Sequence, residues 1–146
     1  MRFLVFISLL FFNSLAHSRL EDKGLLCEII GSKPIKEEVK RNNFLFHHIM
    51  LFQEDIAIRY FLNLNNDKFN IIKLKTNYKY SLTSDYILLE DTWKINRKSL
   101  IMYSQFYEEP HSKCEVYSKE ETMKEFHIIK KKYQKEYNKK LEGNKI

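Results

Sequence analysis

Glycine, proline and cysteine are scarce in this sequence of 146 residues, and their scarcity excludes several classes of protein. The chain has three glycines, two prolines and two cysteines. Three glycines supply neither a GxxxxGK[ST] nor a GxGxxG loop, because both motifs need glycine where the backbone approaches a phosphate. No stretch is rich in proline, glycine or serine, so no linker divides the chain. Hydrophobic residues make up 44% of it and aromatic residues 14%, which is enough to bury the core of one domain.

The first eighteen residues have the pattern of a secretory signal peptide. Arg2 precedes an apolar run over residues 3–12, and small residues follow at Ser14, Ala16 and Ser18. The alternative is an uncleaved membrane anchor, but a spanning helix needs about 20 apolar residues and this run is too short. We predict export, with cleavage near Ala16 or Ser18 and a periplasmic or secreted mature protein.

Cys27 and Cys114 are the two cysteines of the chain. An even number of cysteines in an exported protein favours a disulfide bond. Buried free thiols and a catalytic cysteine are the alternatives, although the sequence has no CxxC pair and no recognisable companion base. A Cys27–Cys114 bridge would span nearly the whole folded region. In the chain-entropy model such a loop stabilises the fold by about 4–5 kcal/mol.

The region between residues 24 and 118 has the period of β-strands. Residues 56–64 are an example, because every second residue is a large apolar one and the residues between them form a second, mixed face. The apolar set is Ile56, Ile58, Tyr60, Leu62 and Leu64, and the mixed set is Ala57, Arg59, Phe61 and Asn63. Short apolar runs separated by turn residues predict about eight strands, at 25–30, 44–52, 56–64, 69–76 (with a short run at 78–80), 86–89, 93–95, 99–103 and 113–117. Their short connections indicate a mainly β fold, an antiparallel meander closed as a small barrel or packed as a sandwich. Closure would make the first and last strands neighbours and bring the two cysteines together.

The chain changes character at Ser118. Residues 119–146 contain nine lysines and five glutamates, a net charge of +4. Ser118 and Glu121 have the spacing of a capping box, and Gly143 is a suitable stop. Apolar residues then recur every three or four positions, at Phe126, Ile129, Tyr133, Tyr137 and Leu141. We predict a signal peptide over 1–18, a β domain over 19–118 and a basic amphipathic C-terminal α-helix over 119–146 that covers part of the sheet.

The sequence carries no catalytic or metal-binding motif. His47 and His48 are adjacent in a predicted strand and therefore point to opposite faces, so they cannot share a metal. Three acidic pairs flank turns or a helix start, where carboxylates are common: Glu90-Asp91, Glu108-Glu109 and Glu120-Glu121. We expect no catalytic residue, no metal and no cofactor, and a hydrolase is the least favoured hypothesis.

A non-catalytic binding or interaction domain is the favoured hypothesis. The interior of a small barrel can hold a small apolar ligand. Seven aromatic residues are candidates for lining such a cavity or filling the core: Phe44, Phe46, Phe52, Tyr60, Phe69, Tyr86 and Trp93. The alternative is association with an anionic membrane or envelope surface through the basic helix, although lysines on a helix are commonly just its solvated face. Candidate anion contacts are Arg97, Lys130, Lys131 and Lys135. A nucleic-acid partner is disfavoured, since exported proteins seldom meet nucleic acid.

Three segments carry a resemblance to a group of proteins. They are Gly24-Leu25-Leu26-Cys27-Glu28, Trp93-Lys94-Ile95-Asn96-Arg97-Lys98-Ser99-Leu100 and Cys114-Glu115-Val116. These segments resemble uncharacterised small exported bacterial proteins that have a signal peptide, a β domain with a cysteine near each end and a Trp…NRK[ST]L hairpin. The resemblance spans roughly residues 1–118 and leaves out the lysine-rich tail. It implies the small β domain, and it implies no activity, cofactor or catalytic residue.

Overall fold

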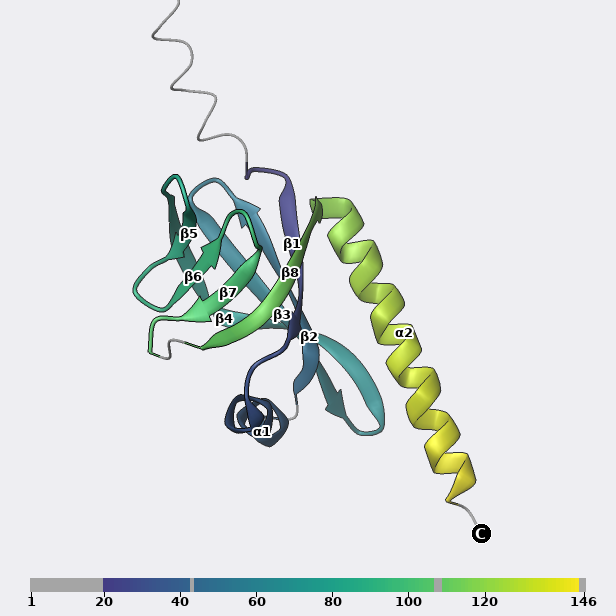
Figure 1. The fold of residues 1–146 in the computed structure, drawn as a ribbon. Helices are drawn as coiled ribbons and strands as arrows, with labels where there is room; N and C mark the ends of the chain where they lie inside the picture. The colour runs from purple at the N-terminus through teal and green to yellow at the C-terminus, as the bar shows by residue number, and fades with distance from the viewer. Residues whose placement is uncertain (1–19, 43, 107–108, 145–146) are drawn as a thin grey trace, which may run out of the picture.

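In the computed structural model, eight antiparallel strands close into a barrel, with one helix across an end and another along the outside (Figure 1). The structure describes residues 20–42, 44–106 and 109–144, so the predicted signal peptide over 1–18 lies outside the described residues. The strands are β1 (Lys23–Ile29), β2 (Phe44–Gln53), β3 (Ile56–Asn65), β4 (Lys68–Leu82), β5 (Tyr86–Leu89), β6 (Trp93–Asn96), β7 (Ile101–Ser104) and β8 (Pro110–Ser118). The helices are α1 (Lys33–Arg41) and α2 (Lys119–Gly143). Each strand pairs with the next and β8 pairs with β1, which confirms the predicted meander and closes it as a barrel.

A disulfide bond closes the seam between β1 and β8. Cys27 and Cys114 are direct partners in the register of these strands, and their sulfurs are bonded. Both side chains are buried inside the barrel. The predicted bridge is therefore confirmed, and it is consistent with an oxidising compartment.

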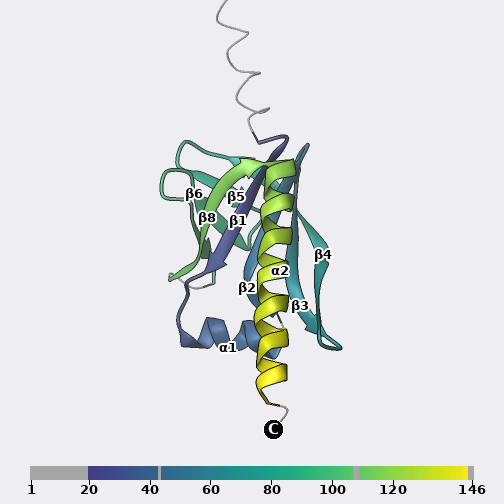
Figure 2. The ribbon, with the colours of Figure 1, turned by 90° about the vertical axis from the view of Figure 1, so that its right-hand side faces the viewer.

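The short helix α1 between β1 and β2 is a feature that the sequence patterns did not predict. Ser32 occupies its N-cap position and Pro34 lies in its first turn, where proline is favoured. Ile35 and Val39, one turn apart, are the buried residues of the helix. A helix this short is marginal by itself, so burial of these two side chains against the end of the barrel stabilises it. Figure 2 shows α1 lying across that end.

Strand β4 is longer than predicted. The runs at 69–76 and 78–80 belong to this one strand, which pairs with β3 along most of its length. The register between β3 and β4 shifts between Ile58 and Tyr60. Such irregularities bend a strand, which helps a sheet to curve into a barrel.

The interior of the barrel has two differently packed halves. One half is filled by the residues around the disulfide, with completely buried side chains that include Met50, Leu89, Ile95 and Met102. The other half lies beneath α1, where Ile29, Ile35, Val39 and Phe61 form a smaller cluster. Space remains between this smaller cluster and the opposite wall of the barrel.

Helix α2 packs along the outside of the barrel. It contacts β1, β2, β4 and β8, and Figure 2 shows it crossing in front of β1 and β2. Ser118 and Glu121 form the predicted capping box. Phe126 is completely buried against the outward-facing side chains of Ile49 and Leu62. The predicted C-terminal helix is confirmed, and it ends at Gly143. Neither helix in the described part of the chain is long and apolar enough to cross a membrane.

Candidate functional site

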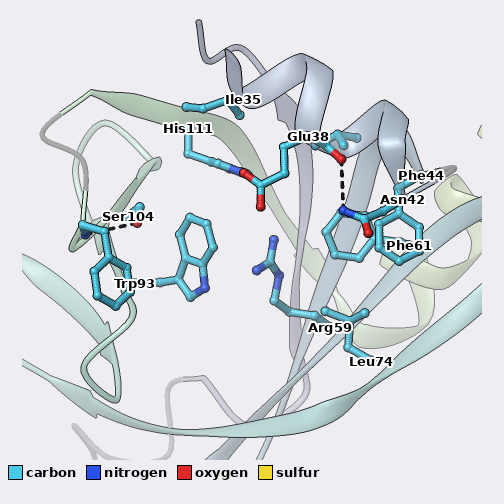
Figure 3. Close-up of a pocket in the computed structure, with 12 residues that line it drawn as sticks. Ile35, Glu38, Asn42, Phe44, Arg59, Phe61, Leu74, Trp93, Ser104 and His111 are labelled. Atoms are coloured by element: carbon cyan, nitrogen blue, oxygen red, sulfur yellow. Dashed lines mark hydrogen bonds between the residues drawn. The ribbon is translucent and has the colours of Figure 1, made fainter. Parts of the chain in front are cut away.

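A cavity of about 480 Å³ lies in the half of the barrel beneath α1 (Figure 3). Its lining residues come from α1 and its C-cap, from six strands and from the turn after β7: Ile35, Glu38, Val39, Asn42, Phe44, Arg59, Phe61, Leu74, Trp93, Ser104, Phe106 and His111. Glu38, Asn42 and Phe106 are the exposed members of this set. The opening of the cavity therefore lies between α1 and the turn that follows β7.

Arg59 is a buried cation in the wall of this cavity. It points inward from β3 and is 3% exposed. Its guanidinium carbon lies 4.8 Å from the centre of the Trp93 ring and 5.0 Å from that of Phe61. The side chain of Tyr78 favours the charged form of the guanidinium, and the buried Nε has no hydrogen-bond partner. Burial lowers the pKa of Arg59 from its usual value.

In the described part of the chain, no carboxylate forms an ion pair with Arg59. Among the residues that the structure describes, the single ion pair within 4.0 Å joins Lys33 and Glu37 on the outside of α1. Glu38 lines the same cavity but makes no ion pair with Arg59. A buried charge without a counter-ion is costly, and folded proteins seldom retain one. Arg59 is therefore the unusual feature of this site.

A short chain of hydrogen bonds runs from the cavity wall into the barrel. His111 Nδ1 lies 2.7 Å from Ser112 Oγ, and Ser112 Oγ lies 3.0 Å from His48 Nε2. Burial, together with a smaller effect of the nearby Arg59 charge, lowers the pKa of His111 to about 4. The same two causes, burial first, hold the pKa of His48 well below its usual range. Both imidazoles are therefore neutral at pH 7.

The arrangement suits binding better than catalysis. Ser112 is completely buried, does not line the cavity and already bonds both imidazoles, so its hydroxyl is no accessible nucleophile. No group of three or more His, Cys, Asp or Glu side chains in the described ranges could hold a metal ion. What the cavity offers is aromatic and aliphatic surface, one guanidinium and one neutral imidazole.

The seven aromatic candidates do not share one site. Phe44 and Trp93 line the cavity. The other five lie elsewhere: Phe46 packs in the cluster beneath α1, Phe52 in the filled half of the barrel, Tyr60 and Phe69 on the outer face near α2, and Tyr86 on β5 with Lys94 over its ring. Sequence periodicity placed these rings in strands, but it did not tell which face each would occupy.

The four candidate anion contacts also lie outside the cavity. Arg97 is exposed at the tip of the β6–β7 hairpin, where its guanidinium donates to the Thr83 carbonyl at 2.6 Å. Asn96 Oδ1 accepts from the backbone N–H groups of Lys98 and Ser99 and fixes this turn. On α2, Lys131 and Lys135 are exposed, and Lys130 is partly buried.

Ten of the twelve lining residues were not among the sequence candidates, and three of these ten define the chemistry of the site: Arg59, Phe61 and His111. One available signal was that Arg59 lies between Ala57 and Phe61 on one face of its strand, so a charged residue interrupts an otherwise apolar face. The chain matches no protein-family model, no curated protein and no solved structure. Its function is accordingly inferred from the geometry of the cavity.

Proposed function

We propose that this protein is an exported, non-catalytic binding protein that holds a small, mainly apolar molecule inside its barrel. The observation that carries the proposal is the cavity of about 480 Å³ between α1 and the filled half of the barrel. Ligand pockets commonly measure about 300–1,000 Å³, and eight-stranded barrels are wide enough to hold one small ligand. The pattern of residues 1–18 and the Cys27–Cys114 bridge support the exported setting.

The walls of the cavity favour an apolar body in the ligand. Ile35 and Val39 of α1 form one side, and Phe61, Leu74 and Trp93 contribute from the strands. Burying about 300 Å² of apolar ligand surface is worth on the order of 7 kcal/mol before the cost of immobilising the ligand. Because the cost of immobilisation is subtracted from this value, we expect dissociation constants no tighter than the micromolar range for simple apolar probes.

Native mass spectrometry of the protein purified from its own host tests this proposal. We expect a mass that matches cleavage near Ala16 or Ser18 less two hydrogens, with additional mass that is lost on denaturation. Leu74→Phe, which fills part of the cavity, should reduce the occupied fraction, whereas Leu141→Phe on α2 should leave it unchanged. A protein that carries nothing, and whose Trp93 fluorescence responds neither to decanol nor to decanoate, would contradict the proposal.

A second candidate function is association with an anionic envelope surface through α2. The supporting observation is that Lys124, Lys131, Lys132, Lys135 and Lys139 are all exposed on the helix that packs its opposite side on the barrel. Exposed basic helices of this kind bind anionic lipid electrostatically.

Charge reversal tests this second candidate without removing α2, whose Phe126 belongs to the packed structure. Replacing Lys131, Lys132 and Lys135 by Glu should abolish salt-sensitive binding to phosphatidylglycerol vesicles. The control variant replaces three exposed lysines outside the helix, Lys75, Lys79 and Lys98, by Glu. It makes the same change in net charge. Equal effects of the two triple variants would show that net charge alone is responsible and would reject a binding role for α2.

A further inference from the structure

Arg59 presents a buried positive charge to the cavity, and none of the carboxylates that the structure describes forms an ion pair with it. We infer that Arg59 binds the acidic group of the ligand, so that the ligand is an amphipathic monoanion with a carboxylate beside Arg59 and an apolar body beneath α1. This inference rests on the proposed function and names the class of ligand that the cavity takes.

The surroundings of the guanidinium leave room for one more partner. Trp93 and Phe61 contact it at 4.8 and 5.0 Å, and such cation–π contacts offset part of the cost of burying the charge. Tyr78 favours the charged form of the guanidinium, but Nε has no hydrogen-bond partner. Figure 3 shows the guanidinium pointing into the cavity toward Glu38, with Trp93 on one side of it and Phe61 on the other. A carboxylate matches the fork of a guanidinium and supplies the missing charge and acceptors.

His111 offers a second donor to the same anion. Its Nδ1 is occupied by Ser112, so Nε2 is the ring nitrogen that remains for the cavity. When His48 Nε2–H donates to Ser112 and the Ser112 hydroxyl donates to His111 Nδ1, the proton of His111 lies on Nε2. An anion beside Arg59 would favour this tautomer of His111, because the anion then accepts a hydrogen bond from Nε2–H of the neutral ring. Trp93 lies against both groups, with its ring centre 4.6 Å from that of His111.

Glu38 limits the charge that the cavity accepts. Among the described residues that line the cavity, Glu38 is the one carboxylate, and it lies exposed on α1 at the opening. A ligand with a second negative charge would meet Glu38, and this described lining holds no second cation to balance that charge. A single carboxylate is neutralised by Arg59 alone. The charge pattern therefore favours a monoanion over a phosphate ester or a dicarboxylate.

Trp93 is the only tryptophan in the sequence, so its fluorescence reports directly on occupation of the site. The oxidised protein at pH 7.5 is titrated with decanoate, decanol and decyltrimethylammonium, each below its micelle-forming concentration. These probes share an alkyl chain and differ in charge. We expect decanoate to bind about tenfold more tightly than decanol, since a hydrogen bond to a charged group is worth on the order of 1 kcal/mol more than a neutral one. The cationic probe should bind most weakly.

Variants identify the residue responsible. Arg59→Met should remove the preference for decanoate while decanol still binds, and Arg97→Met, at the exposed hairpin tip, should preserve the preference. Glu38→Gln should tighten decanoate binding about two- to fivefold and leave decanol unchanged, because it removes a repulsive charge near the opening. The Glu38 variant tests the inference independently, since an exposed residue can be changed without disturbing the core.

The possible results separate the two proposals. Equal binding of decanoate and decanol would overturn the role of Arg59 and leave the apolar cavity standing. A preference for decanoate that survives Arg59→Met, or that weakens in Glu38→Gln, would also overturn the inference. Binding of none of the three probes would overturn the proposed function itself.

Discussion

The guanidinium of Arg59 lies 4.8 Å from the centre of the Trp93 ring, inside a barrel whose other half is filled with apolar side chains. The two residues come from β3 and β6, strands that are not neighbours in the sheet. They meet because both point inward beneath α1. This pair places a charge and a large aromatic surface in one cavity, which is the combination an amphipathic ligand needs.

Replacing Arg59 by methionine should stabilise the empty protein. Exchanging buried charged groups for apolar ones of similar shape is often neutral or stabilising by about 1–4 kcal/mol. Loss of the contacts with Trp93 and Phe61 offsets roughly 1–2 kcal/mol of that gain. We expect the free energy of unfolding, measured in urea without ligand, to rise by about 1 kcal/mol. A loss of more than about 2 kcal/mol would mean that Arg59 holds the fold together, and Arg97→Met measures the background effect of removing an arginine.

Acid should destabilise the fold through its buried histidines. The unfolded chain protonates histidine near pH 6.5, whereas burial and the charge of Arg59 hold the pKa of His111 at about 4 in the folded protein. Between these values the unfolded state binds more protons, so the free energy of unfolding falls as the pH falls from 6.5 to 4. The lowered pKa of His111 alone reduces the free energy of unfolding by about 3 kcal/mol over this pH range. The lowered pKa of His48 adds to the loss in the same direction.

Urea unfolding at a series of pH values measures this dependence. His111→Gln should reduce the loss of stability between pH 6.5 and 4, because the substituted side chain does not titrate there, and the contribution of His48 should remain. His127→Gln, at an exposed position of α2, is the matched control and should keep the slope of the unmodified protein. Identical slopes for the two variants would refute the assignment to His111.

The approach of α2 to the barrel depends on Gly24 of β1. A Cβ at this position would lie 2.7 Å from Thr122 Cβ and 2.9 Å from Leu51 Cδ2, which is too close for either neighbour. Thr122 is completely buried. Gly24→Ala should therefore cost about 1–3 kcal/mol through overpacking. The control is Gly143→Ala, whose Cβ would meet nothing within 4 Å, and it should leave the melting temperature almost unchanged. Equal changes in melting temperature for the two variants would contradict the close packing of α2.

The disulfide should account for a large share of the stability. Cys27 and Cys114 are separated by 87 residues, and closing a loop of that order is worth about 4 kcal/mol in the chain-entropy model. The double variant Cys27→Ser, Cys114→Ser should show a correspondingly lower midpoint in urea. A reductant should lower the midpoint of the unmodified protein and leave that of the double variant alone. If the free energies of unfolding of the oxidised protein and the double variant differ by less than about 1 kcal/mol, strand pairing closes the barrel without help from the disulfide.

The strands, the bridge and the long helix could be predicted because each depends on a local pattern. Alternation marks the strands, two cysteines leave one possible pairing, and Ser118 and Glu121 mark the start of α2. Helix α1 escaped prediction because two apolar residues, Ile35 and Val39, are too few to establish a helical period.

The binding residue Arg59 escaped prediction for a different reason. In β3 the more apolar set, which includes Tyr60 and Leu62, faces outward and packs beneath α2. The set that contains Arg59 and Phe61 faces the interior of the barrel. Alternation shows that a strand has two faces, but when a helix covers the outside both faces are buried. Only the three-dimensional arrangement shows which face lines the cavity.

A crystal structure of the oxidised protein with decanoate is the most direct test of the central claim, that the barrel binds an amphipathic anion at Arg59. We expect the carboxylate at hydrogen-bond distance, about 3 Å, from the guanidinium, with the alkyl chain between Trp93 and α1. Decanoate bound on the outer surface of α2, or inside the barrel with its carboxylate at the opening and away from Arg59, would contradict it.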